Sequence, residues 1–278
     1  MIKFNVSFNN FKRLIMTQYI QLIIIIFLIG CITGLTSGKQ GIPSKNFDNG
    51  IIIYGDKVLE NQSSADSINA KDIWKNYINA IGGVENLKKV NDRSTIMESN
   101  INGHNIVMTI YQKAPDKMKQ IITTSAITQN IYFDGSEGIM EVGGKKMNIT
   151  GRELEKLKYE SIIDFIINLD SLGVKIRYAG IEKINNNDSF KIELLLPSGS
   201  KIFQYFNPKT WLKVKQVEDV TAAQKTYQQE TYFDDYREIR GVKYPYSIKE
   251  SLGAQTMEVK VTSIKINSGL DDSLFKIK

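Results

Sequence analysis

Residues 102–111 read NGHNIVMTIY. The pair Asn102–Gly103 is typical of a two-residue type I′ turn between two antiparallel strands. After the turn, Ile106, Met108 and Ile110 alternate with less apolar residues. Residues two apart lie on the same face of a strand. The stretch therefore predicts a β-hairpin with one apolar face, which must be buried against something.

The same pattern recurs through the rest of the chain. Apolar residues alternate with polar ones in the stretches 190–196 and 257–261. Turn signals are spread between them, at 114–116, 134–135, 143–144, 185–188, 197–199, 207–208 and 240–241. Many short strands joined by tight turns predict an antiparallel meander that curls or pairs into sheets.

Two helical segments are expected beside these strands. In the first, apolar residues recur with helical spacing from Ile73 to Ile81, with Asn69 as its N-cap. Gly82–Gly83 ends this helix, and a further short helical turn is expected over Val84–Val90.

The second helix is expected from a capping box at Thr150 and Glu153 and runs to about Asn168. Its second half, Ile162–Leu169, is apolar almost all round, so it must be covered on more than one side. Pattern alone leaves two interpretations open for this half. It is either a central core helix or a lid that closes over an apolar cavity.

The composition excludes several functional classes. The chain of 278 residues has a net charge of +6, and its basic residues form no cluster interleaved with aromatic side chains, so we expect no nucleic-acid partner. One cysteine and one histidine allow no internal disulfide, zinc site or Cys–His pair. The acid pairs Asp234–Asp235 and Asp271–Asp272 are expected on solvated faces or in turns. We therefore expect no metal, no cofactor, no catalytic residue and no enzyme activity.

The single cysteine ends the most apolar stretch of the chain, Leu22–Cys31, which reads LIIIIFLIGC. Lys12 and Arg13 precede this stretch, and the small residue Gly30 stands directly before the cysteine. These features are those of an export signal, and the last four residues resemble a bacterial lipobox. We expect residues 1–30 to be a lipoprotein-type signal peptide and Cys31 to be lipidated.

An uncleaved transmembrane anchor is the competing interpretation of this region, because Leu14–Leu35 carries no charge. In both interpretations the rest of the chain lies outside the cytoplasm. Residues 31–65 are rich in small and polar residues and are expected to be a flexible tether, with one short strand at Ile51–Tyr54. Residues 66–278 then form the folded domain.

Four runs in this domain resemble a bacterial protein family. They are AKDIWKNYINAIGGVENLKKV, FDGSEGIMEVGGKKMNITGRELEKLK, YFDDYREIRGVKYPYSIKES and NSGLDDSLFKI. The family is that of the LolA/LolB-like outer-membrane lipoprotein-sorting proteins. The nearest counterpart is the domain appended to the C-terminus of some bacterial insulinase-type zinc peptidases, whose peptidase domain is absent here.

The resemblance implies an α+β, mainly β fold, in which a curved antiparallel sheet forms an incomplete barrel and helices plug its concave side. It also implies a function without catalysis, as a carrier or acceptor that holds acyl chains of lipids or lipoproteins in an apolar cavity. The resemblance favours the lid for Ile162–Leu169. The lipid-binding residues of the cavity and lid are then expected to be Trp74, Tyr77, Ile78, Met108, Ile110, Met118, Leu154, Leu157, Ile162, Ile163, Ile166 and Ile167.

These expectations place the protein in the cell envelope, attached through acylated Cys31 and facing the periplasm, with the outer membrane favoured over the inner one. The alternative is an envelope protein-interaction module with a filled core, acting as an accessory to a separately encoded zinc peptidase. An apolar cavity on the concave side favours the first function, whereas a fully packed concave side with an exposed apolar patch favours the second.

Overall fold

The computed structural model describes residues 69–101, 103–222, 225–253 and 255–277. It contains the α-helices α2 (Ala70–Ala80), α3 (Gly83–Leu87) and α4 (Gly151–Ser161), and the 3₁₀ helices η1 (Phe165–Ile167) and η2 (Asp272–Phe275). The strands are β1 (Asp92–Ile101), β2 (His104–Lys113), β3 (Lys117–Thr124), β4 (Thr128–Phe133), β5 (Gly138–Val142), β6 (Lys145–Ile149), β7 (Lys175–Ile184), β8 (Asn187–Leu195), β9 (Lys201–Phe206), β10 (Lys213–Ala222), β11 (Lys225–Ile239), β12 (Val242–Leu252) and β13 (Gln255–Ile266).

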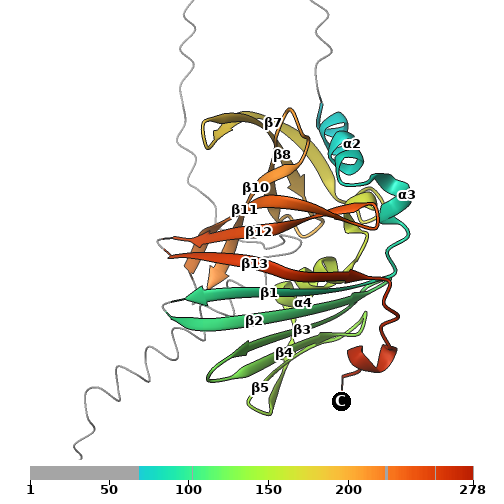
Figure 1. Ribbon diagram of the computed structural model, residues 1–278, viewed down its shortest axis with the longest axis vertical. Coiled ribbons are helices and arrows are strands. Elements are labelled where there is room, and N and C mark those ends of the chain that lie inside the picture. The colour runs from blue at the N-terminus through green and yellow to red at the C-terminus, as the bar shows by residue number, and fades with distance from the viewer. Residues whose placement is uncertain (1–68, 102, 223–224, 254, 278) are drawn as a thin grey trace, which may run out of the picture.

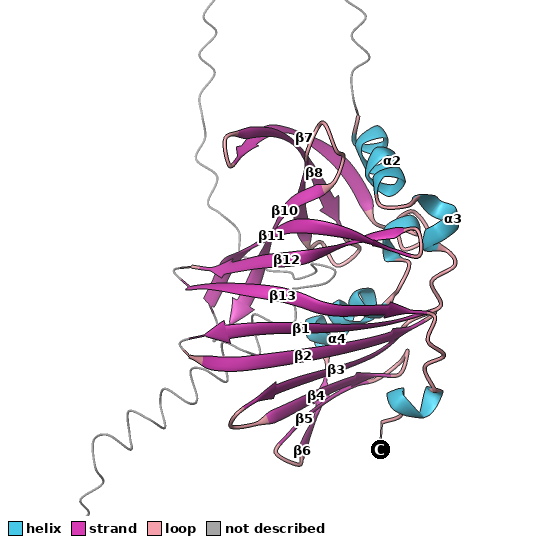
Figure 2. Ribbon diagram, in the orientation of Figure 1, coloured by secondary structure: helices cyan, strands magenta, loops and turns pink. Residues whose placement is uncertain are grey.

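The strands form one antiparallel sheet of 13 strands, in the order β6-β5-β4-β3-β2-β1-β13-β12-β11-β10-β9-β8-β7. The sheet curves strongly without closing, and α2, α3 and α4 lie beside it (Figures 1 and 2). This confirms the predicted fold class, a mainly β incomplete barrel. Because β6 and β7 are its two edge strands, the chain between them must cross from one edge to the other. That crossing contains α4 and η1.

The hairpin predicted from residues 102–111 is confirmed. In the antiparallel ladder between β1 and β2, Ile101 is the partner of His104. Ile106, Met108 and Ile110 are at most 3% exposed and belong to the main core. The alternation therefore identified the face of β2 that lines the inside of the curved sheet.

The first predicted helix, α2, is also confirmed. The Asn69 side chain accepts a hydrogen bond from the Asp72 backbone N–H at 3.0 Å, and all five residues of the apolar stripe are buried. After the helix, Gly82 has φ +131°, and an alanine Cβ there would lie 2.1 Å from the Gly241 carbonyl oxygen. Only glycine allows this approach, which holds the α2–α3 junction against the start of β12.

The second predicted helix is shorter than expected, and its capping box is absent. The Thr150 side chain makes no capping hydrogen bond, and α4 ends at Ser161 rather than near Asn168. Ile162 has an extended conformation, and only Phe165–Ile167 returns to a short 3₁₀ turn. The two adjacent isoleucines are β-branched and favour extended backbone over a helix. Ile162–Leu169 is therefore an irregular segment, not half of a helix.

Several expectations concern residues outside the described part of the chain. These are the signal peptide, Cys31, the tether and the strand at Ile51–Tyr54. Among the described residues, none of the helices has both the length and the apolar character needed to cross a bilayer.

Candidate functional site

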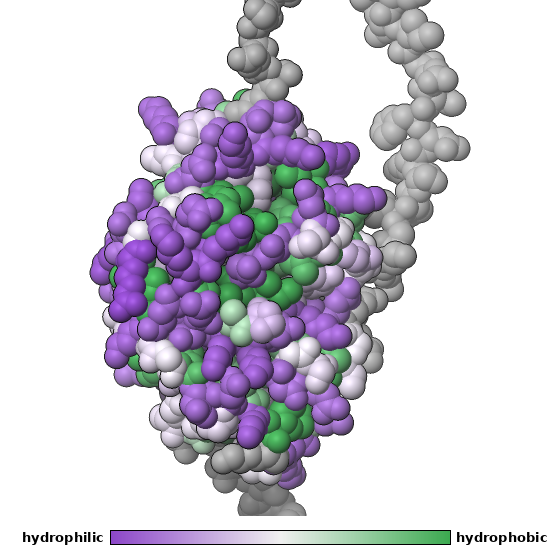
Figure 3. All heavy atoms as spheres, turned by 90° about the vertical axis from the view of Figure 1, so that its right-hand side faces the viewer, coloured by the Kyte–Doolittle hydropathy of each residue, from purple (hydrophilic) through white to green (hydrophobic). Residues whose placement is uncertain are grey.

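The concave side of the sheet contains an apolar pocket of about 140 Å³. Its walls come from α2, α3, β1 and the strands β9–β13, and the segment Ile162–Ile166 closes part of it. In Figure 3, apolar groups gather in the middle of the face that lies to the right in Figure 1, with hydrophilic groups around them. The lid predicted from sequence therefore contributes directly to a pocket wall.

The segment Ile162–Leu169, called the crossing segment below, is attached to α2 by a hydrogen bond. The Trp74 indole N–H donates a hydrogen bond to the Ile166 carbonyl oxygen at 2.9 Å. Trp74 and Tyr77 in turn pack on the ring of Phe206, at centroid distances of 6.1 and 5.0 Å. The segment Ile162–Leu169 itself is only half-buried, except at Phe165 and Leu169. It therefore packs on the core while presenting apolar side chains at the surface.

The structure separates the twelve residues predicted to bind lipid into two groups. Tyr77, Ile162, Ile163 and Ile166 line the pocket. The other eight pack in the same core outside the pocket wall, and they are Trp74, Ile78, Met108, Ile110, Met118, Leu154, Leu157 and Ile167. Met108 is 2% exposed and accepts a hydrogen bond from Gln120, so it is part of the tightly packed core.

Most of the pocket wall was missed by sequence reasoning. Strands β1, β11 and β13 contribute side chains that include Met97, Phe233, Tyr236 and Val261. The alternation predicted an inward face for β2, β8 and β13 only. It carried no information on where along the strand the interior is filled and where it is open.

The size of the pocket limits what it holds in this conformation. A cavity of about 150 Å³ lined by apolar side chains takes up a molecule as small as benzene, whereas ligand sites for drug-sized molecules have about 300–1,000 Å³. The present pocket has about 140 Å³. It therefore accommodates a short piece of an alkyl chain, and a longer ligand requires the crossing segment to move.

One end of the pocket is polar and buried. Lys213 and Gln204 both line it, with exposed fractions of 9% and 4%. Their side chains donate to the same acceptor, Gln216 Oε1, at 3.3 and 2.9 Å. Burial lowers the pKa of Lys213 to about 8, against the opposing effect of Glu218. The amine is therefore still mostly protonated at neutral pH.

A second buried polar group joins α4 to the inner face of the sheet. Gln112 on β2 donates to the Glu160 carbonyl oxygen at 2.7 Å and accepts from Arg93 Nε at 3.1 Å. The Glu160 carboxyl lies 3.6 Å from Lys156 Nζ, and both side chains are almost fully buried. Burial raises the pKa of Glu160 to about 8, despite the opposing effect of Lys156. Protonation of this carboxyl therefore matters for stability rather than for the pocket, which it does not line.

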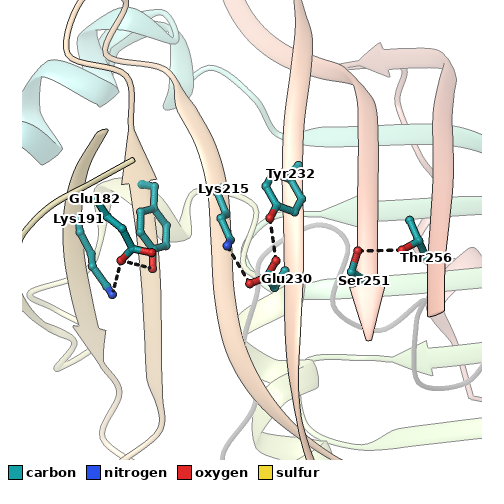
Figure 4. A network of polar contacts seen from close by, with 8 residues as sticks. Glu182, Lys191, Lys215, Glu230, Tyr232, Ser251 and Thr256 are labelled. Atoms are coloured by element: carbon teal, nitrogen blue, oxygen red, sulfur yellow. Dashed lines mark hydrogen bonds and ion pairs between the residues drawn. The ribbon is translucent and has the colours of Figure 1, made fainter. Parts of the chain in front are cut away.

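The outer face of β7–β13 carries a polar network of a different kind (Figure 4). Lys191 Nζ lies 2.9 Å from Glu182, and Lys215 Nζ lies 2.8 Å from Glu230. The Tyr232 hydroxyl donates to the same Glu230 at 2.7 Å. Each of these two lysines thus has a carboxylate partner. These cross-strand ion pairs stabilise the pairing of neighbouring strands.

The described residues contain no group of three or more His, Cys, Asp or Glu side chains placed to hold a metal ion. Both acid pairs are exposed, as expected. Asp272 binds Lys113 and Lys117 at 2.9 and 3.3 Å, and Asp235 binds Arg237. Asp271 accepts from the backbone N–H of Ser273. These carboxylates have surface ion-pair and capping roles.

The methionines contribute less to the pocket than their number indicates. Met108, Met118 and Met257 are buried in the core, and Met147 on β6 is 47% exposed. Among the described methionines only Met97, which sequence reasoning did not select, lines the pocket. The interpretation of the selected methionines as ordinary packing residues fits their positions better.

No protein-family model and no curated protein matches the sequence. Solved structures do match. A LolA superfamily protein from Nitrosomonas europaea is 13% identical, with a TM-score of 0.51 over 76% of this chain and 99% of that chain. A DUF1329 family protein from Desulfovibrio piger is 12% identical, with a TM-score of 0.49 over 74% of this chain and 97% of that one.

A third match is an outer membrane lipoprotein-sorting protein domain from Vibrio parahaemolyticus. It is 12% identical, with a TM-score of 0.46 over 66% of this chain and 88% of that chain. At such identities the likeness concerns the fold and says nothing of residue roles. Together with the curved, unclosed sheet and the segment that crosses its concave side, the first match shows that this chain has the fold of the LolA superfamily.

Proposed function

We propose that this protein is a membrane-anchored envelope lipoprotein that binds acyl chains of lipids or lipoproteins, as a carrier or acceptor and without catalysis. The observation that carries the proposal is the apolar pocket on the concave side, part of whose wall is the half-buried segment Ile162–Ile166. An acyl chain gains about 0.8 kcal/mol for each methylene group that it buries. A pocket that extends along such a wall therefore needs no polar contact to bind a chain.

Loading requires the crossing segment to leave part of its present position, because about 140 Å³ is too small for a long chain. Gly151, at the start of α4, and Gly173, after the crossing segment, have φ of +61° and +70°. Glycine adopts such angles without steric cost, so these two positions are suited to act as hinges. The Trp74–Ile166 hydrogen bond breaks when the segment moves and limits how far it opens spontaneously.

The location follows from the N-terminal sequence. Cys31 is the proposed site of lipidation, residues 31–65 the proposed tether, and the outer membrane, facing the periplasm, the proposed location. A fixed anchor suits an acceptor or a sensor better than a diffusing carrier.

The test is native mass spectrometry of the purified full chain, followed by organic extraction and lipid analysis. We expect a co-purified lipid in stoichiometric amount. Ile163→Asp and Ile166→Asp are expected to abolish it, because each places a charge in the pocket wall. Ile181→Asp is the matched control, since Ile181 is 60% exposed on β7 and should leave the lipid in place.

An apo mass together with no uptake of added fatty acid or lipopeptide would reject acyl binding. It would favour the second candidate, an envelope protein-interaction module. One observation supports that candidate, namely that Ile162, Ile163, Ile166 and Ile167 are all half-exposed on one short segment. In that case the same two aspartate variants should disrupt a protein complex instead, which cross-linking followed by mass spectrometry would detect.

A further inference from the structure

Lys213 is a buried cation that makes no direct ion pair in the described part of the chain. It begins β10, is 9% exposed and lines the pocket. None of the ion pairs among the described residues includes it, although Glu218 acts on it through space. Its remaining contacts are Gln216 Oε1 at 3.3 Å and the Phe233 ring at 4.3 Å. A buried charge normally has an opposite charge beside it.

A local irregularity turns this lysine inward. The ladder between β9 and β10 shifts register between Lys213 and Lys215. A bulge places two successive residues on the same side of a strand, which reverses the alternation beyond it. Lys215 consequently lies in the outer network and binds Glu230, whereas Lys213 two residues earlier lines the pocket. Bulges that re-aim a side chain in this way are frequent next to functional sites.

The surroundings of Lys213 fit an anion. Arg93, Lys213 and Lys243 line the pocket, and no aspartate or glutamate is among the described lining residues. A carboxylate offers anionic oxygens that accept hydrogen bonds from the Lys213 ammonium group.

We propose that the buried end of the pocket binds the carboxylate of a fatty acid through Lys213 Nζ, with the alkyl chain running along Ile163 and Ile166 toward the surface. This rests on the proposed function, because it names the acyl ligand and its orientation. Because the carboxylate head group lies in the protein interior, the site selects a free fatty acid with one alkyl chain. A phospholipid or lipopeptide would have to bury a much larger head group in the same space.

The experiment is a titration of the purified full chain in amphipol with dibromostearic acid and with its methyl ester. Bromine quenches nearby indole fluorescence, and Trp74 lies against the crossing segment. We expect the wild-type chain to bind the acid about tenfold more tightly than the ester, the effect of one charge-assisted hydrogen bond. Lys213→Met should lower affinity for the acid to that for the ester and leave the ester unaffected.

Lys215→Met is the matched control, because it removes the same charge from the same strand on the outer face. It should leave the preference for the acid unchanged. Equal affinity of the wild-type chain for acid and ester would overturn the carboxylate site while leaving acyl binding intact. Quenching by neither ligand would overturn both proposals. Tighter binding of a brominated lysophospholipid than of the acid would overturn the choice of a carboxylate.

Discussion

Replacement of Phe206 by alanine is expected to lower the free energy of unfolding by about 3–5 kcal/mol. Phe206 ends β9, is 0% exposed and packs against Trp74 and Tyr77 of α2. Truncation leaves a cavity at the contact that joins the helix to the sheet. The same change weakens the support of Trp74, which holds the crossing segment through Ile166. Urea unfolding followed by circular dichroism measures the effect.

Phe203→Ala is the matched control for this prediction. Phe203 lies on the same strand, is half-buried on the outer side and packs in the small second cluster rather than in the main core. Its truncation should cost about 1 kcal/mol or less, as expected for a partly exposed site. Equal losses for the two variants would mean that α2 is not anchored through Phe206.

Stability of the wild-type chain is expected to fall as the pH rises from about 4.5 to about 8, by an amount on the order of 5 kcal/mol that originates in Glu160. The unfolded chain releases this proton near 4.5, whereas burial keeps it on the folded protein until about 8. Between these values the folded state binds more protons, so removing protons favours unfolding. The contribution is fully present below pH 4.5 and lost above pH 8.

Glu160→Gln removes this proton equilibrium and keeps the shape of the side chain. The variant should lose less stability between pH 5 and pH 8 than the wild-type chain does, which urea unfolding at several pH values measures. Lys213 does not affect stability between pH 4.5 and pH 8. Because its pKa is lowered from 10.5 to about 8, it makes stability rise with pH only between about pH 8 and pH 10.5. Glu258→Gln is the control, since Glu258 is an exposed carboxylate on β13. Parallel pH profiles for wild type and Glu160→Gln would contradict the prediction.

Local patterns were sufficient for the elements whose conformation depends on near neighbours. The alternation at Ile106, Met108 and Ile110 identified the inward face of β2, and the stripe from Ile73 to Ile81 identified the buried face of α2. In both cases the period of the backbone decides which side chains share a face. The segment after Ser161 misled the same reasoning, because an apolar run without polar positions carries no period that separates helix from irregular structure.

The sequence pattern by itself determined the antiparallel meander, the amphipathic helix and the apolar character of the segment that crosses between the edge strands. Only the tertiary structure decided where the pocket lies, because its walls combine α2, α3, the crossing segment and strands from both halves of the chain. It also decided that Lys213 faces inward. A single bulge between Lys213 and Lys215 reverses the alternation there, and strand pairing rather than residue type produces that bulge.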